Sequence, residues 1–260
     1  MFRYLCRAKI RKTLRYFIDL AYDGSAFHGW QVQPNAISVQ ENLEEALRVA
    51  FQKEIGVVGA GRTDAGVHAK QLIAHFDVDK KINAPQLKFK LNTLLPKEIA
   101  INAIYQVQDE THARFHAIAR EYKYYVTTQK NPFVEAYSYY VKKEIDLDLM
   151  NKAAKILFHH RDFKCFSKSK TDVYTYNCDI LFAEWVKQED LLVFTIKADR
   201  FLRNMVRAIV GTLIEVGLRK LSIEDFENVI ISRNRSNAGK SVDAKGLFLT
   251  KVEYPKTVLI

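Results

Sequence analysis

The sequence has little cysteine and no cysteine pattern that builds a fold. Its 260 residues include three cysteines, none of them in a CxxC pair: Cys6, Cys165 and Cys178. An odd, widely spaced set argues against a disulfide framework and against a structural zinc site, so we expect no metal. Reduced thiols of this kind are typical of the cytoplasm, and we predict that location.

Long apolar runs and several common motifs are also missing. No apolar run approaches the length of a membrane span, so no membrane partner is expected. The first residues are basic and lack the apolar stretch and cleavage site of a secretory signal. The sequence contains no GxxxxGK[ST] loop, no GxGxxG fingerprint and no GxSxG elbow, which argues against nucleotide triphosphate, dinucleotide and serine-hydrolase chemistry.

Positive charge, in contrast, is abundant. The chain carries 40 Lys and Arg against 30 Asp and Glu, a net charge of +10. Such an excess favours a polyanionic partner, most simply nucleic acid, although a merely basic globular protein is the alternative. Hydrophobic residues make up 48% of the chain, which is enough for a sizeable core and argues against disorder.

Hydrophobic periodicity predicts two halves of similar element order. Between 15 and 110 the order is β-α-β-β-α-β, and between 111 and 260 a similar order returns with insertions. Ser38, Asp148 and Ser222 are the expected N-caps of three of the helices. We therefore predict an α+β protein with two antiparallel or mixed sheets, a cleft between the halves, and a basic arm at residues 1–14.

The most informative stretch is a glycine-rich loop that carries one carboxylate, Asp64. Gly59 and Gly61 precede it, Gly66 follows it, and Arg62 adds a fixed positive charge. Glycines let a backbone turn sharply or approach another backbone closely. On spacing alone the loop is either a structural turn that happens to carry Asp or the display of a reactive carboxylate.

An apolar helix predicted over 204–216 carries a single charge between Met205 and Ile214, that of Arg207. Such a helix should be largely buried, and a buried guanidinium needs an acceptor because stranding it costs several kcal/mol. Arg207 either extends to solvent at the helix end or meets Asp64 across the cleft. The second arrangement would favour an ionised, oriented carboxylate, as a nucleophilic mechanism requires.

Two further groups of residues are candidates for contact with RNA. Tyr122 and Tyr124 share one face of a predicted strand, where they either stack on unpaired bases or pack in the core of a sheet. Basic residues in a Ser-rich stretch and before the apolar helix resemble a loop over phosphates, with a solvated loop as the alternative; they are Lys164, Lys168, Lys170 and Arg203. His112 and His116 have helical spacing but lack an HExxH acid, which argues against metal ligation there.

Taken in order, these residues resemble the tRNA pseudouridine synthase A family. The resemblance runs from about residue 15 to 255 and is strongest at 61–69, with the sequence GRTDAGVHA. Matching segments follow in order along the chain: 22–25, 29–31, 38–41, 112–115, 120–124, 201 with 205–207, 210–211 and 246–247. The segment 241–245 departs from the Ala-Pro-Ala type of many relatives, and the basic arm lies outside the match.

The resemblance implies a pseudouridine synthase fold and a cofactor-independent enzyme that isomerises uridines of the tRNA anticodon stem-loop, at about positions 38 to 40. It implies that Asp64 is the nucleophile, that Tyr122 contacts the target base and that Arg207 pairs with Asp64. Arg62 would hold the flipped nucleotide, and Leu247 would belong to the substrate pocket. The family is a homodimer with one tRNA spanning both subunits. Whether the carboxylate attacks C1′, abstracts the neighbouring ribose proton or adds to C6 of the base stays open.

Overall fold

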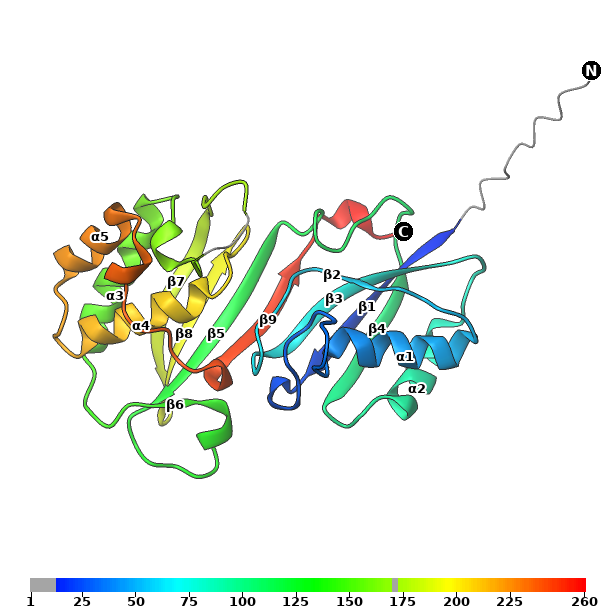
Figure 1. Cartoon of the computed structure of the whole chain (residues 1–260), viewed down its shortest axis with the longest axis horizontal. Coiled ribbons are helices and arrows are strands. Elements are labelled where there is room, and N and C mark those ends of the chain that lie inside the picture. The colour runs from blue at the N-terminus through cyan, green and yellow to red at the C-terminus, as the bar shows by residue number, and fades with distance from the viewer. Residues whose placement is uncertain (1–12, 170–172) are drawn as a thin grey trace, which may run out of the picture.

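A computed structural model describes residues 13–169 and 173–260, which form one continuous mixed sheet with helices packed against it. The order of the main strands is β4-β1-β3-β9-β5-β8-β7, with β2 beside β3 and β6 beside β5 (Figure 1). The strands are β1 (Leu14–Tyr22), β2 (Val58–Gly59), β3 (His68–Val78), β4 (Ile99–Gln106), β5 (Ala119–Thr127), β6 (Tyr139–Tyr140), β7 (Ile180–Gln188), β8 (Leu191–Ala198) and β9 (Leu247–Glu253).

Within the described residues, five α-helices lie toward the two ends of this sheet. Two accompany the strands β1 to β4, and three accompany β7 and β8 at the opposite end (Figure 1). They are α1 (Val39–Phe51), α2 (Ala84–Leu94), α3 (Leu147–Ile156), α4 (Met205–Gly217) and α5 (Ile223–Ser232). The mixed α+β class predicted from the periodicity is therefore confirmed.

The predicted helix caps are confirmed at two positions and wrong at a third. The Ser38 side chain accepts the backbone N–H of Glu41, and Ser222 forms a reciprocal capping box with Asp225. The third cap is Asp146 instead of Asp148, because the Asp146 backbone is extended and its carboxylate accepts the Leu149 N–H at 3.0 Å. Both acids precede the same apolar face, so sequence spacing does not distinguish them.

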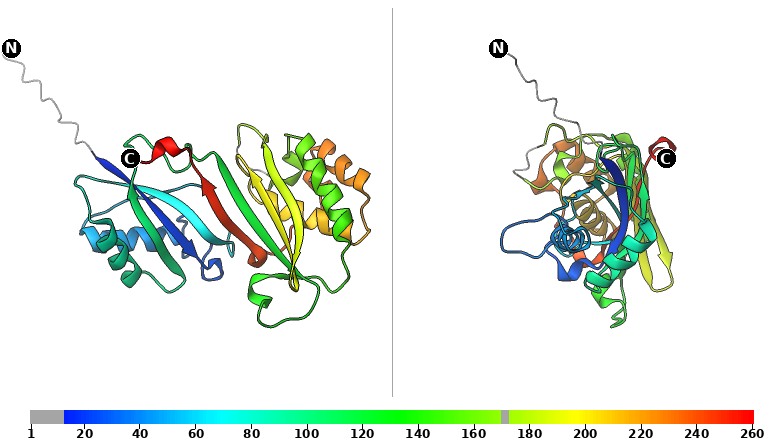
Figure 2. Two further views of the ribbon diagram at one scale, coloured as in Figure 1. Left: turned by 180° about the vertical axis from the view of Figure 1, so that it is seen from behind. Right: turned by 90° about the vertical axis from the view of Figure 1, so that its right-hand side faces the viewer.

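The prediction of two sheets is wrong, because the last strand joins them into one. β9 pairs in parallel with β3 through His68–Phe248 and Ala69–Leu249, and in antiparallel fashion with β5 over most of its length. Figure 2 shows β5 and β9 running side by side through the centre of the molecule. Pairing between strands so far apart in the sequence leaves no trace in local periodicity.

Two hydrophobic clusters lie on either side of this junction. One is built mainly on β1, β3, β4 and α1, and the other on β5, β7, β8 and α4. Tyr122 of β5 packs against both, and Leu249 and Val252 of β9 belong to the first cluster although they come from the end of the chain. The division into 15–110 and 111–260 stays a prediction. Nearly all of the basic arm, 1–14, lies outside the described residues.

Candidate active site

The Asp64 loop (residues 60–67) connects β2 to β3 and is held by the segment that follows β1. The backbone N–H of Trp30 donates to the carbonyl oxygen of Thr63 at 3.3 Å, and that of Gly66 donates to Phe27 at 3.2 Å. Inside the loop, the Val67 N–H donates to the Asp64 carbonyl oxygen. Both backbone sides of Asp64 are thus fixed, so the position of its side chain is set by the fold.

Two glycines make possible the contact between the Asp64 loop and the segment that follows β1, and only one of them lies in the loop. Gly66 has φ +74°, a conformation that side chains rarely adopt. Gly29 has φ +98°, and a Cβ there would lie 2.5 Å from the Thr63 carbonyl oxygen. Gly61 does not have a positive φ, and nothing lies within 4 Å of a Cβ built there. Neither the backbone conformation nor the packing therefore requires a glycine at this position. Spacing alone drew attention to Gly61 and missed Gly29.

A buried phenol anchors the residue before Asp64. The Tyr22 hydroxyl and the Thr63 hydroxyl are 2.8 Å apart, and both side chains are buried. Burial raises the pKa of Tyr22 well above its usual value, so the phenol stays neutral and can donate this hydrogen bond. The strand β1 therefore helps to fix the Asp64 loop through the hydrogen bond between Tyr22 and Thr63, which the sequence pattern did not indicate.

Two arginines lie beside the Asp64 carboxylate. Arg203 Nε is 3.7 Å from Oδ1, and Arg207 Nη1 is 4.0 Å from Oδ2. The predicted approach of Arg207 to Asp64 is therefore present as a charge contact, whereas the closer arginine is Arg203, predicted only as an RNA contact. Neither arginine donates a hydrogen bond to Asp64, and no other described residue does so, which leaves the carboxylate lone pairs available.

Arg207 is positioned by the close packing of residues 240–242 on α4. Its Nε donates to the Val242 carbonyl oxygen at 2.7 Å, and the Val242 N–H donates back to the Arg207 carbonyl. The segment comes so close that a Cβ on Gly211 would lie 1.9 Å from the Lys240 carbonyl oxygen. Apart from Glu215, the remainder of α4 is buried as predicted, and Arg207 keeps 22% of its side chain exposed.

Tyr122 lies at the centre of the sheet, opposite Leu249 on β9 and Ile196 on β8. Its ring meets that of Phe201 edge to face, with centroids 5.2 Å apart. Burial raises the pKa of Tyr122 to about 12; the positive charge of Arg120 opposes this rise, and the charge of Asp64 adds to it. Tyr122 is therefore a neutral phenol at physiological pH.

The other candidates have different surroundings. Tyr124 is a core residue, fully buried, whose hydroxyl donates to the Asp243 carbonyl oxygen. Leu247 lies opposite Tyr124 at the start of β9 and is 5% exposed. Arg62 is exposed, and among the described residues it has no hydrogen-bond or ion-pair partner.

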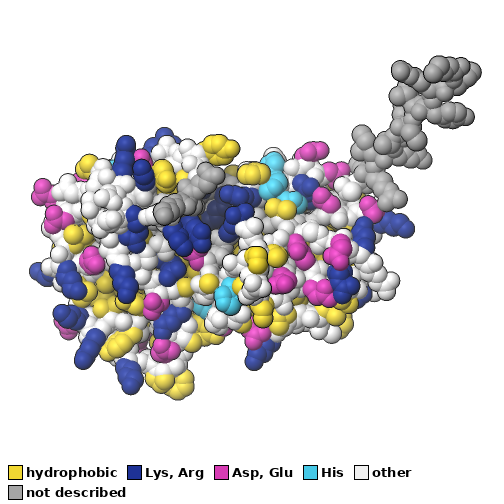
Figure 3. Space-filling model, viewed as in Figure 1, with side chains coloured by type: hydrophobic (Ala, Val, Ile, Leu, Met, Phe, Trp, Pro, Cys, Tyr) yellow, Lys and Arg dark blue, Asp and Glu magenta, His cyan; other side chains and the backbone are white. Residues whose placement is uncertain are grey.

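Of the predicted RNA-binding residues that the structure describes, Lys168 contacts Arg203 and Lys164 contacts an aromatic ring. The Lys168 N–H donates to the Arg203 carbonyl oxygen at 3.0 Å, and the Lys164 ammonium lies over the Tyr176 ring at 5.5 Å. Lys170 lies outside the described residues. Figure 3 shows Lys and Arg side chains gathered in a hollow near the middle of one face. Residues 111–260 carry 25 basic against 18 acidic side chains, whereas residues 15–110 carry 10 against 12.

The helical spacing of His112 and His116 does not correspond to a helix in the structure. The two residues lie in a turn instead of a helix, and His116 Nδ1 accepts the backbone N–H of His112. Within residues 13–169 and 173–260, no cluster of three or more His, Cys, Asp or Glu side chains is arranged to hold a metal ion. In the same ranges, no helix combines the length and apolar character needed to cross a membrane.

Known proteins are similar in sequence to this chain over nearly its full length. A family model described as tRNA pseudouridine synthase matches residues 20–116 and 153–255. The tRNA pseudouridine synthase A of Bacteroides fragilis is 52% identical over 246 residues, covering 94% of this chain and 98% of the relative. That of Parabacteroides distasonis is 54% identical over 243 residues (93% and 96%), and that of Bacillus subtilis 38% over 245 residues (93% and 99%).

The protein is a basic chain with an α+β fold, and its central site holds one carboxylate beside two arginines. These features are consistent with an enzyme that acts on RNA. The chain belongs to the tRNA pseudouridine synthase family. Members of this family are isomerases that convert uridine to pseudouridine, and this protein is accordingly an enzyme of tRNA pseudouridylation.

Proposed function

We propose that the protein isomerises uridine in the anticodon stem-loop of tRNA, at about positions 38 to 40, with Asp64 as the nucleophile. The observation that carries the proposal is the state of the Asp64 carboxylate. Its backbone is fixed on both sides, arginines stand 3.7 and 4.0 Å away, and no described residue donates a hydrogen bond to it. An oriented carboxylate with unengaged lone pairs is suited to attack on an electron-poor carbon.

The reaction breaks the N1–C1′ glycosidic bond and forms a C5–C1′ bond. The proton on C5 is lost and N1 gains one, so atoms and electrons balance without an oxidant, a reductant or a leaving group. A retaining glycosidase also directs a carboxylate at a glycosidic carbon, but it adds a second acid for its departing alcohol. Here the detached uracil stays in the site and is itself the group that returns.

The target uridine must leave its stack before Asp64 can reach it, which requires a pocket for the base. We assign Tyr122 to the base, because its ring meets that of Phe201 edge to face and packs against both hydrophobic clusters, at the centre of the sheet. Arg62, exposed and unpaired among the described residues, is assigned to the displaced nucleotide, and Leu247 to the apolar wall. Lys164, Lys168, Lys170 and Arg203 are assigned to the phosphates.

The test is an Asp64→Asn variant incubated with unmodified tRNA, with pseudouridine mapped by carbodiimide modification and primer extension. Product should be abolished while tRNA affinity is retained. An Asp190→Asn variant makes the same chemical change at the exposed turn between β7 and β8 and should match the unmodified enzyme. Transcripts with cytidine at each of positions 38, 39 and 40 then define the target. Pseudouridine formed by Asp64→Asn would rule out Asp64 as the nucleophile.

The proposal extends to the assembly and the location of the enzyme. We propose a cytoplasmic homodimer in which one tRNA contacts both subunits, as the family resemblance implies. Sedimentation of the protein with and without tRNA measures the stoichiometry. A complex of one protein chain with one tRNA would contradict it.

A further inference from the structure

An exposed aromatic side chain, Phe115, lies on a turn beside the Asp64 loop but outside the site described so far. The turn comprises residues 111–118, between β4 and β5, and we call it the Phe115 turn. Phe115 is 74% exposed and Ile118 is 53% exposed, so neither side chain contributes to the core. The Phe115 ring is contacted by His112, with centroids 4.3 Å apart, and by the Arg114 guanidinium, 5.7 Å from its centroid.

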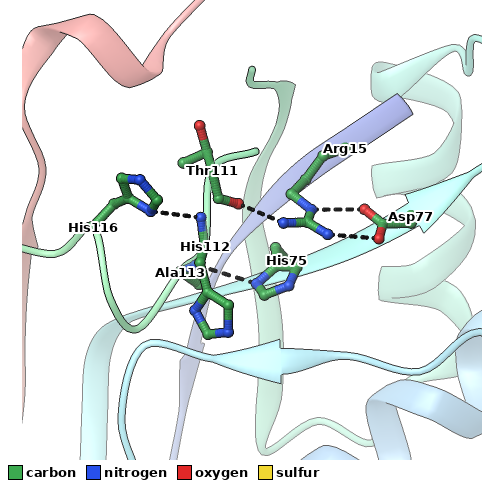
Figure 4. Close-up of polar contacts among 7 residues, drawn as sticks. All are labelled: Arg15, His75, Asp77, Thr111, His112, Ala113 and His116. Carbon is green, nitrogen blue, oxygen red and sulfur yellow. Dashed lines mark hydrogen bonds and ion pairs between the residues drawn. The ribbon is translucent and has the colours of Figure 1, made fainter. Parts of the chain in front are cut away.

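The Phe115 turn is fixed by hydrogen bonds with β1, β3 and β9, and Figure 4 draws those with β1 and β3. His75 Nδ1 on β3 accepts the Ala113 N–H at 3.2 Å, and Arg15 on β1 donates to the Thr111 carbonyl oxygen at 3.1 Å while it pairs with Asp77. Further along, the Ile118 N–H donates to Glu253 of β9, and the Tyr254 hydroxyl donates to the Ala113 carbonyl oxygen. Because the backbone of the turn is already ordered, it loses little conformational entropy when a ligand binds to Phe115.

The Phe115 turn is also joined to the Asp64 loop through the side chain of Arg120. A single nitrogen of Arg120, Nη2, donates to the Arg114 carbonyl oxygen at 2.6 Å and to the Ala60 carbonyl oxygen at 3.0 Å. The backbone next to Phe115 therefore lies against the beginning of the loop that carries Asp64. Figure 3 shows His and hydrophobic side chains along the upper edge of the face whose middle holds the Lys and Arg group.

The chemistry of this surface fits an unpaired nucleobase. An exposed ring bordered by a guanidinium and an imidazole binds a flat, electron-rich partner by stacking, and the neighbouring positive charge favours a ligand with a phosphate backbone. RNA loops supply such bases, because those bases are not committed to a helical stack. We propose that Phe115, with His112 and Arg114, stacks on an unpaired base of the tRNA other than the target uridine. The inference rests on the proposed function, from which it takes tRNA as the ligand.

The first test measures equilibrium binding of unmodified tRNA to the full chain. Loss of one stacked base predicts that Phe115→Ala weakens affinity by roughly five- to a hundredfold. Phe89→Ala removes a ring of nearly the same exposure, 76%, from α2 and should leave affinity unchanged. Unchanged affinity of Phe115→Ala would overturn the proposal. A change in its oligomeric state on sedimentation would also overturn it, because the ring would then contact a second copy of the chain.

The second test reads stacking directly. The two native tryptophans, Trp30 and Trp185, are 3% and 1% exposed, so a Phe115→Trp variant has one exposed indole. Stacking predicts that tRNA quenches this additional fluorescence and that affinity is retained. Heparin, a polyanion without bases, should bind without quenching it. Equal quenching by heparin and tRNA would reject base stacking.

These binding tests do not depend on catalysis, so the two proposals fail separately. If the unmodified enzyme forms no pseudouridine in the anticodon stem-loop but Phe115→Ala still weakens tRNA binding, the proposed function fails and the stacking surface stands. If pseudouridine forms and neither Phe115 variant shows an effect, the stacking surface fails alone.

Discussion

The Arg120 guanidinium donates a hydrogen bond to the Ala60 carbonyl oxygen at 3.0 Å, and so ties β5 to the beginning of the Asp64 loop. The same guanidinium donates to the carbonyl oxygens of Arg114, Ala117 and Asp199. One side chain thus joins the Asp64 loop, the Phe115 turn and the end of β8. Arg120 stands two residues before Tyr122, so the strand that carries the proposed base contact also fixes the position of the nucleophile.

Replacement of Arg120 by Met should therefore affect both stability and catalysis. The loss of several charge-assisted hydrogen bonds to partly buried carbonyl oxygens predicts a fall in the free energy of unfolding of about 2–4 kcal/mol. Under conditions where the variant is still folded, kcat should fall about tenfold or more, because a displaced Asp64 loses its alignment with the ribose. Urea unfolding and single-turnover kinetics measure the two effects.

The matched control for Arg120 is Arg48→Met. Arg48 lies on the exposed face of α1 and pairs with Glu45 in water, so its replacement should leave the free energy of unfolding almost unchanged. If Arg120→Met behaves like this control in both measurements, the guanidinium does not hold the Asp64 loop in place.

Gly29→Ala should disturb the Asp64 loop from its other side. The φ of +98° and the 2.5 Å approach of a Cβ to the Thr63 carbonyl oxygen force the backbone to move, at a cost of about 2–3 kcal/mol. The activity of the folded fraction should fall as well, since Thr63 precedes Asp64. Chemical denaturation measures the first effect, and the rate of pseudouridine formation measures the second.

Gly61→Ala provides the comparison within the loop itself. Nothing lies within 4 Å of a Cβ there, and φ is not positive, so stability should stay equal or rise by up to about 1 kcal/mol. A Gly29→Ala variant as stable as Gly61→Ala would show that the contact between segment 29–30 and the loop is easily rearranged.

The phenol of Tyr122 should remain neutral in the working range of the enzyme. Burial raises its pKa to about 12 from an unfolded value near 10, so the folded state keeps the proton that the unfolded state loses above pH 10. This contribution to stability is fully present below pH 10 and is lost as pH rises through 12. Tyr122→Phe should reduce the alkaline slope of the unfolding free energy, by at most about 2–3 kcal/mol over that interval.

The same neutrality has a consequence for catalysis. A phenol that stays protonated cannot act as a general base near pH 7 but can stack on the base and donate a hydrogen bond. The profile of kcat against pH should therefore have no limb between pH 7 and 10 that Tyr122→Phe removes. Such a limb would show that the phenol ionises in the complex with tRNA.

His75 predicts pH dependence on the acid side. Burial, and next the charge of Arg15, lower its pKa to about 4, and its neutral Nδ1 accepts the Ala113 N–H. Between pH 6.5 and 4 the unfolded state binds a proton that the folded state does not, so stability is present above pH 6.5 and is lost as pH falls through 4. The loss should amount to at most about 3 kcal/mol.

Thermal and urea unfolding of His75→Gln between pH 4 and 7 tests this, because glutamine keeps an acceptor for Ala113 and does not titrate. Its acid slope should be smaller than that of the native chain. His159→Gln makes the same substitution at an exposed histidine and is the control for the substitution itself. Identical slopes for all three proteins would place the acid sensitivity elsewhere.

The periodicity of the sequence determined most of the secondary structure. Apolar residues at helical or alternating spacing predicted α1, α4 and the strand β5, because their burial is a local property that each segment carries in its own pattern. The same holds for the N-cap at Ser222 and for the buried character of α4 around Arg207. The GRTD segment and its ordered matches likewise identified the family, although from the residues alone Asp64 remained open to a structural interpretation.

Only the tertiary structure decided which of these segments meet. It showed that β9 inserts between β3 and β5, so that one sheet replaces the two predicted. It brought Arg203 nearer to Asp64 than Arg207, and it placed Gly29 against Thr63 and Arg120 against Ala60. Each of these contacts joins residues that are more than 30 positions apart. Local propensity contains no information about such pairs, because their geometry follows from the packing of the completed sheet.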